Sequence, residues 1–117
     1  KNTIKRKLTQ CIPWNTIQCM IEIRQTETYR KWFDNLKDYT ARARIDIRIR
    51  RMSLGNPGDV KPVGNGVSEL RIDYGPGYRV YFIKKREIIV ILLCGGDKST
   101  QRKDIQKAHE LSGNLEE

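Results

Sequence analysis

Arg71 and Arg79 stand on either side of a Gly75-Pro76-Gly77 segment, each within a short run that alternates apolar and polar residues. Alternate side chains of an extended strand point to the same face, so both arginines are predicted to lie on the less apolar face of one sheet. A guanidinium group keeps its charge and binds phosphate through two parallel N–H groups. Together with Lys61 and Lys98, the pair would bind an RNA phosphate and stabilise the negative charge that builds up during its cleavage.

Aromatic residues accompany these basic groups. The rings of Tyr74, Tyr78 and Tyr81 could stack on unpaired bases, as the aromatic residues of single-stranded RNA readers do. The alternative is that Tyr78 is a core residue and that Arg71 and Glu69 belong to an ordinary solvated strand face. Composition and spacing leave both interpretations open.

Other catalytic constellations are missing from the sequence. The single histidine, His109, falls late in the chain, and no Ser-His-Asp set assembles around it. Acidic residues do not cluster with histidine, so neither a metal site nor another cofactor is expected. The glycine-rich stretches 55–58 and 95–98 do not have the spacing of a phosphate-binding loop. They are interpreted as a helix stop and a strand-end turn.

Length and charge narrow the class further. A chain of 117 residues is expected to form one domain, and its net charge of +9 favours an anionic partner such as nucleic acid. No run approaches the roughly 20 apolar residues that a membrane span needs. Three cysteines without close spacing indicate neither a disulfide framework nor a zinc site, which points to a reducing cytoplasm.

Strands are predicted to position the two arginines. The runs Val67–Tyr74, Tyr78–Ile83 and Ile88–Cys94 are separated by turn signals and indicate an antiparallel meander. The last run is apolar throughout, as in a central strand covered on both faces. Val60–Val63 is predicted to form an edge strand, because Pro62 lacks an N–H, with Gly64-Asn65-Gly66 as the following hairpin turn. Gly95 and Gly96 are predicted to release the chain from the sheet.

Three helices are predicted around this meander. Tyr29, Trp32, Phe33 and Leu36 form one apolar stripe after a cap at Thr26 or Thr28. Residues 41–50 alternate like a strand but also fit a helix from Asp38 to Leu54, and their length favours the helix. A last helix is expected from Ser99 or Thr100 to about Leu111.

The first 19 residues differ from the rest, with no clear period and a proline at position 13. They are expected to be a non-native or flexible extension, with Met20 as the natural start and residues 20–117 as a single domain. An ordered extra strand is the alternative. A strand near residues 21–24 then precedes the helical pair, so the fold class is predicted as α+β.

Short motifs follow one another in a fixed order along the chain: Trp32-Phe33, Ala43-Arg44-Ile45, Arg48-Ile49, Gly55-Asn56, Gly58-Asp59, Glu69-Leu70-Arg71-Ile72, the run from Gly75 to Phe82, Gly95-Gly96-Asp97-Lys98 and Gln101. This ordered set resembles the addiction-module killer proteins of the RelE/ParE toxin superfamily, in a HigB-like, phage-derived Gp49-like branch. The resemblance covers Met20 to about Ala108 and implies a RelE-like fold: an N-terminal strand and helical hairpin on a four- to five-stranded, mainly antiparallel sheet, with a C-terminal helix.

By this resemblance, Arg79 corresponds to the central catalytic arginine, Arg71 to the arginine one strand earlier, and Lys98 to the basic residue after the last strand. Substrate contacts are expected from Lys61, Tyr78, Tyr81, Gln101, Arg44 and Arg48. The lysines of RelE-type strands are replaced by Val67 and Glu69. The general-base tyrosine of the final helix is absent, and Asp104 or Gln101 lies nearby instead.

The resemblance implies the toxin of a bacterial type II toxin–antitoxin pair. Many such toxins cleave mRNA on the ribosome without metal, the 2′-hydroxyl attacking the adjacent phosphate. The expected partners are a helix-turn-helix antitoxin and ribosome-bound mRNA, with operator DNA contacted only through the antitoxin complex, no membrane, and a cytoplasmic location. The alternatives are a ParE-like DNA gyrase poison and a non-catalytic co-repressor.

Overall fold

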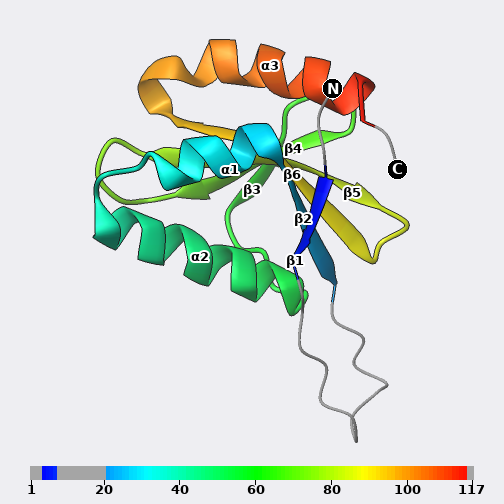
Figure 1. The fold of residues 1–117 in the computed structure, drawn as a ribbon, viewed down its shortest axis with the longest axis horizontal. Helices are drawn as coiled ribbons and strands as arrows, with labels where there is room; N and C mark the ends of the chain where they lie inside the picture. Colours follow the sequence, from blue (N-terminus) through cyan, green and yellow to red (C-terminus); the bar gives the residue numbers. More distant parts are fainter. Residues whose placement is uncertain (1–3, 8–20, 116–117) are drawn as a thin grey trace, which may run out of the picture.

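The computed structural model describes residues 4–7 and 21–115 and shows a sheet packed between helices. The elements are β1 (Ile4–Lys7), β2 (Glu22–Thr26), α1 (Glu27–Asp34), α2 (Tyr39–Ser53), β3 (Val60–Pro62), β4 (Val67–Ile72), β5 (Tyr78–Lys85), β6 (Ile89–Asp97), the 3-10 helix η2 (Lys98–Thr100) and α3 (Gln101–Gly113). Figure 1 shows α3 along one side of the molecule and α2 along the opposite side, with the strands between them.

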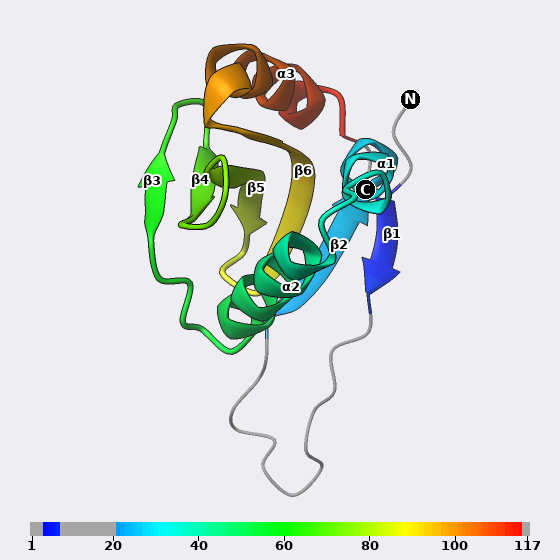
Figure 2. The ribbon, with the colours of Figure 1, turned by 90° about the vertical axis from the view of Figure 1, so that its left-hand side faces the viewer.

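The strands form one sheet in the order β1-β2-β6-β5-β4-β3, with β3 and β1 at its two edges (Figure 2). Strand β2 runs parallel to β6, and every other neighbouring pair is antiparallel. The predicted α+β class, the helical hairpin, the mainly antiparallel sheet and the C-terminal helix are therefore confirmed. Strand β1 adds a sixth strand to the four or five that were expected.

Strand β1 lies within the predicted extension, and its backbone pairs with β2 from Ile4↔Thr26 to Lys7↔Ile23. Residues 1–3 and 8–20 lie outside the described part of the chain. That residues 1–19 are an extension therefore stays a prediction.

Each face of the sheet carries its own apolar core. The face under the helical hairpin buries aliphatic strand residues against α1 and α2, among them Leu70, Val80 and Leu92 against Phe33 and Ile45. The face under α3 buries a second set, among them Val67, Ile83 and Leu93 against Ala108 and Leu111. Strands β4, β5 and β6 are thus covered on both sides, so a polar side chain pointing to either face has to find partners there.

Residues 41–50, which fitted either a strand or a helix, lie in α2, so the helix interpretation is confirmed. Its stripe of Ala41, Ile45, Ile49 and Met52 is buried, which a strand with period two would not achieve. Asp38 is the N-cap of α2: its Oδ1 accepts hydrogen bonds from the backbone N–H of Thr40 (3.0 Å) and Ala41 (3.2 Å).

The prediction that Gly95 and Gly96 end the last strand is wrong, because β6 continues through both to Asp97. A β-bulge opposite the Tyr81–Phe82 step shifts the alternation of β6, so that Leu93 and Cys94 both join the core under α3. The buried Thr26 hydroxyl donates to the carbonyl of Leu93 at 2.6 Å and fixes the chain at this irregularity.

The two glycines of β6 are explained by packing. A Cβ on Gly95 would overlap the ring of Trp32 in α1, and a Cβ on Gly96 would overlap the carboxylate of Asp104 in α3. The last helix begins after Thr100, which is one of its two predicted starting positions. Asp97 caps η2 by accepting from the backbone N–H of Ser99 at 2.8 Å, whereas Thr100 makes no capping bond to α3.

Candidate functional site

Strand pairing places Arg71 of β4 directly opposite Arg79 of β5, and Arg79 opposite Gly96 of β6. Val67 and Tyr81, which lie an even number of residues away on these strands, belong to the core under α3, so both arginines point to that face. Opposed side chains in a sheet have Cβ atoms about 5 Å apart. The predicted placement of the two arginines on one face is confirmed.

The next row along the same face contains a buried carboxylate. Lys61, Glu69 and Tyr81 are partners across β3, β4 and β5, and Glu69 is fully buried. Its Oε2 accepts hydrogen bonds from the Tyr81 hydroxyl (3.1 Å) and from Nε2 of Gln101 (2.7 Å). Its Oε1 lies 3.5 Å from Nη1 of Arg79. Glu69 therefore joins two strands to the first turn of α3.

This ion pair leaves donors unused. The side chain of Arg79 is 11% exposed, and its buried Nε and Nη1 have no hydrogen-bond acceptor. Oε1 of Glu69 likewise has no hydrogen-bond donor, because 3.5 Å is too long for a directed bond. Glu69 thus supplies charge compensation for Arg79 without saturating its guanidinium group.

Arg71 has a different partner. Its Nε and Nη2 donate to Oδ1 of Asp59 at 3.2 and 3.0 Å, and this hydrogen bonding raises the pKa of Arg71. Both side chains are substantially exposed, at 39% and 55%. Water screens such a surface pair, so another anion can compete with Asp59 for the guanidinium group.

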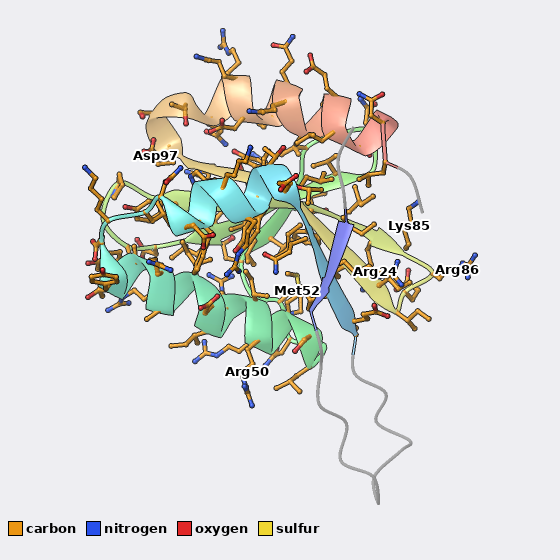
Figure 3. All side chains as sticks on the ribbon, in the orientation of Figure 1. Arg24, Arg50, Met52, Lys85, Arg86 and Asp97 are labelled. Carbon is orange, nitrogen blue, oxygen red and sulfur yellow. The ribbon has the colours of Figure 1, made fainter. Side chains whose placement is uncertain are left out.

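Two lysines flank the arginines. Lys61 and Lys98 are exposed and make no hydrogen bond or ion pair with the residues that the structure describes. Lys98 lies next to the β4–β5 hairpin: a Cβ added to Gly77 in that hairpin would be 3.5 Å from the Cβ of Lys98. Figure 3 shows Asp97, the neighbour of Lys98, on the side of the molecule opposite Lys85 and Arg86 of the β5–β6 hairpin. The cluster of basic residues formed by Lys61, Arg71, Arg79 and Lys98 therefore lies toward the end of the sheet away from that hairpin.

Asp104 adds a carboxylate from α3. It is half-buried, its Oδ2 accepts a hydrogen bond from the Thr100 hydroxyl at 2.5 Å, and it occupies the space above Gly96. Since Gly96 is the cross-strand partner of Arg79, the carboxylate lies where a side chain beside Arg79 would otherwise stand. Burial raises the pKa of Asp104, and the hydrogen bond from Thr100 offsets part of that effect.

Two residues expected to contact substrate have internal partners instead. The ring of Tyr81 is fully buried and is not exposed for stacking on a base, and burial together with the Glu69 carboxylate raises its pKa. Gln101 donates to Glu69. Both therefore donate to the carboxylate of Glu69.

Three further expected substrate residues lie on the opposite side of the sheet. Tyr78 packs edge-on against Trp32 of α1, with ring centroids 6.4 Å apart. The guanidinium group of Arg44 lies 4.8 Å from the centroid of the Tyr74 ring. Arg48 donates to the carbonyls of Arg71, Pro57 and Asp59, and burial lowers its pKa. Arg48 thus reaches the backbone of Arg71, but none of the three side chains contacts the guanidinium groups of Arg71 and Arg79.

Three acidic residues of the site were not assigned a role from the sequence: Asp59, Glu69 and, beyond its place near the final helix, Asp104. The spacing of Glu69 two residues before Arg71 put it on the correct face, but the solvated face considered for it is wrong because it is buried. Asp59 lies in a loop and is brought to Arg71 by β3–β4 pairing, for which the sequence carries no local signal.

Two further searches of residues 4–7 and 21–115 gave negative results. No three or more histidine, cysteine or acidic side chains gather in a way that would suit a metal ion. None of the helices in this part of the chain has the length and apolar character to cross a bilayer.

Comparisons with known proteins place the chain among relatives. The model of the family of phage-derived Gp49-like proteins matches residues 31–112, a segment that contains every residue of the site. An uncharacterized protein of Haemophilus influenzae is 52% identical over 95 residues, covering 81% of this chain and 96% of that relative. No solved structure matches the chain significantly.

Proposed function

This chain belongs to the phage-derived Gp49-like family, and from that premise we propose that it is the HigB-like toxin of a bacterial type II toxin–antitoxin pair. The family is toxin-like and related to the RelE/ParE-type addiction modules. The proposed activity is metal-independent cleavage of mRNA on the ribosome in the cytoplasm, which stops translation. Its proposed regulator is a helix-turn-helix antitoxin that covers the basic face and links the toxin to operator DNA.

The observation that carries the nuclease proposal is the direct opposition of Arg71 and Arg79 on one sheet face. Like charges at opposed strand positions repel each other, and here the carboxylates of Asp59 and Glu69 offset that repulsion. An oxyanion placed between the two groups converts that repulsion into binding, and two fixed guanidinium groups stabilise charge that grows on a phosphate. The unpaired lysines 61 and 98 extend the cluster along the path of a nucleic-acid backbone.

In the proposed reaction the 2′-oxygen of one nucleotide attacks the adjacent phosphorus, and the bond to the 5′-oxygen of the next nucleotide breaks. Arg79, oriented from below by Glu69, and Arg71, released from Asp59, hold the non-bridging oxygens. Lys98 lies near the hairpin between their strands and adds charge at the exposed rim. The products are a 2′,3′-cyclic phosphate and a free 5′-hydroxyl.

One observation favours a non-catalytic alternative. Each arginine already has a carboxylate partner, Asp59 for Arg71 and Glu69 for Arg79, and such pairs also serve purely structural ends. In that case the protein would act by binding alone, as a ParE-like gyrase poison or as a co-repressor with its antitoxin. The two classes differ in whether mRNA is cut.

Induced expression followed by mapping of the 5′ ends of cellular mRNA tests the proposal. Cuts within translated codons are expected for the unaltered protein, and Arg71→Ala, Arg79→Lys and Lys98→Ala should each lower cutting by at least tenfold. Lysine is chosen at position 79 because it keeps a positive charge beside buried Glu69. Alanine there would leave that carboxylate unpaired and would confuse instability with lost activity.

Arg50→Ala is the matched control. Arg50 is an exposed arginine on α2, and Figure 3 shows its side chain pointing away from the sheet, so cutting should be unchanged. DNA damage with intact mRNA would replace the nuclease proposal with the gyrase alternative. Absence of any growth effect would leave the co-repressor.

A further inference from the structure

One carboxylate of the site, that of Asp104, has no role in the proposed binding of phosphate. Asp104 lies in the first turn of α3, and its side chain fills the space over Gly96. A residue with a side chain at position 96 would exclude it. The absent side chain thus lets a carboxylate approach the strand at the position directly opposite Arg79.

Only one oxygen of this carboxylate is engaged. The Thr100 hydroxyl donates to Oδ2 at 2.5 Å, and within the described part of the chain no group donates to Oδ1. Asp104 is half-buried, and the hydrogen bond from Thr100 holds its carboxylate through Oδ2, which leaves Oδ1 without a competing hydrogen bond. A carboxylate that is fixed through one oxygen, over the strand position opposite Arg79, suits the role of a general base.

We propose that Asp104 is the general base of the cleavage reaction and takes the proton from the attacking 2′-hydroxyl. This inference rests on the proposed nuclease function. The 2′ O–H bond breaks as its proton passes to Oδ1, the 2′-oxygen bonds to phosphorus, and the phosphorus–5′-oxygen bond breaks. The leaving 5′-oxygen takes a proton from water, and Asp104 returns its own proton to solvent.

The surroundings of Asp104 suit this task. Burial raises the pKa of Asp104 from the ordinary aspartate value, which makes its carboxylate a stronger base than that of an exposed aspartate. Asp97 of β6 acts in the same direction, whereas Lys103 and Lys107 of α3 and the Thr100 hydroxyl act against it. Arg79 of β5 is the cross-strand partner of Gly96 beneath Asp104, but it is not among the charges that shift the pKa of Asp104. On the same face, Glu69 is a buried carboxylate, and Tyr81 and Cys94 are neutral because burial raises their pKa values, that of Cys94 to about 12.

The test measures single-turnover cleavage of a reporter mRNA on programmed ribosomes, with the protein in excess, as a function of pH. For the unaltered protein the logarithm of the rate should rise with slope one at low pH and then level off as Asp104 loses its proton. Asp104→Asn should lower the plateau rate about 100- to 10,000-fold. The concentration that gives half-maximal rate should stay within about threefold, because the phosphate contacts remain.

Two further variants separate a base from a structural residue. Asp104→Glu should recover part of the rate and keep the acidic limb. Thr100→Val removes the hydrogen bond that lowers the pKa of Asp104, so the acidic limb should move to higher pH with the plateau retained. Glu110→Gln is the matched control: an exposed carboxylate on the same helix, whose removal should leave the rate and the profile unchanged.

The outcomes are distinct. The role of Asp104 would be overturned if Asp104→Asn cleaved at the unaltered rate or kept the acidic limb of the pH profile. It would also be overturned if the acidic limb did not move in Thr100→Val. Either result would leave the nuclease function in place. Absence of cleavage by the unaltered protein would overturn both. Melting curves from circular dichroism show whether each variant is folded. If Asp104→Asn is not folded, the shift of the acidic limb in Thr100→Val decides the role of Asp104.

Discussion

At the scale of single residues, the buried carboxylate of Glu69 holds the site together. Moving a charge out of water costs several kcal/mol unless close partners replace the lost hydration. Tyr81, Gln101 and Arg79 replace it here, although the contact to Arg79 is long. A well-packed apolar residue would serve stability as well, so we interpret Glu69 as a positioning residue that fixes Arg79 from the side away from substrate.

The stability of Glu69 variants tests that interpretation. Glu69→Ala leaves the guanidinium group of Arg79 buried without an anion, and the hydroxyl of Tyr81 and the amide of Gln101 without an acceptor. We expect the free energy of unfolding to fall by about 3–5 kcal/mol, measured by urea denaturation. Replacing both charges, as in Glu69→Leu with Arg79→Met, should cost much less than the two single changes together.

Asp59→Ala is the matched comparison, since it removes the carboxylate partner of the other arginine. Both members of that pair are exposed, so water replaces Asp59 and the loss of stability should be far smaller than for Glu69→Ala. Equal losses for the two variants would contradict the distinction drawn between a buried and a surface pair.

At the scale of elements, strand β6 decides how closely the helices approach the sheet. It is covered on both faces, and its bulge places Gly95 toward α1 and the next glycine toward α3. The packing of Trp32 onto the strand depends on the absence of a side chain at position 95. The helical hairpin and the sheet face that carries Arg71 and Arg79 are therefore positioned by the same short segment.

Gly95→Ala is expected to destabilise the protein, because its Cβ overlaps the rigid ring of Trp32 and not the end of a flexible chain. Overpacking of this kind costs about 1–3 kcal/mol, which urea denaturation will detect. Gly113→Ala at the end of α3 is the control: its Cβ meets nothing within 4 Å, and the change should alter stability by no more than about 1 kcal/mol.

The elements themselves were largely predictable, and the errors have physical causes. Period-two alternation identified β4 and β5, and a buried stripe with helical spacing identified α2, because both signals are local. Glycine in β6 resembled a strand end, although it serves helix packing from both sides. The parallel pairing of β2 with β6 joins segments more than 60 residues apart, and no local pattern specifies it.

At the scale of the whole molecule, the net charge of +9 is the property that a nucleic-acid partner would meet first. Charge alone does not distinguish the face with Arg71 and Arg79, because basic residues also occur on the outer side of α2 and in the β5–β6 hairpin, where Figure 3 shows Arg50 and Arg86. The difference between surfaces has to come from which lysines and arginines touch phosphate.

Salt dependence of RNA binding measures those contacts. For a single-stranded RNA oligonucleotide, each phosphate contact contributes about −0.7 to the slope of log K against log salt. Lys61→Ala and Lys98→Ala should therefore each make the slope shallower by about that amount, as measured by fluorescence anisotropy. Arg86→Ala, on the far side of the molecule, should leave the slope unchanged. An equal effect of all three changes would indicate non-specific attraction without a defined face.

The sequence by itself determined that Arg71 and Arg79 share a sheet face, since alternation along two strands joined by a short hairpin is a local property. It also determined the helical stripes and the excess of positive charge. The tertiary structure decided which groups surround the arginines. Burial of Glu69, the approach of Asp59 to Arg71 and the seating of Asp104 over Gly96 all depend on the bulge in β6, on strand pairing and on how α3 crosses the sheet. These contacts join segments far apart in the chain, and a pattern within any one segment carries no information about them.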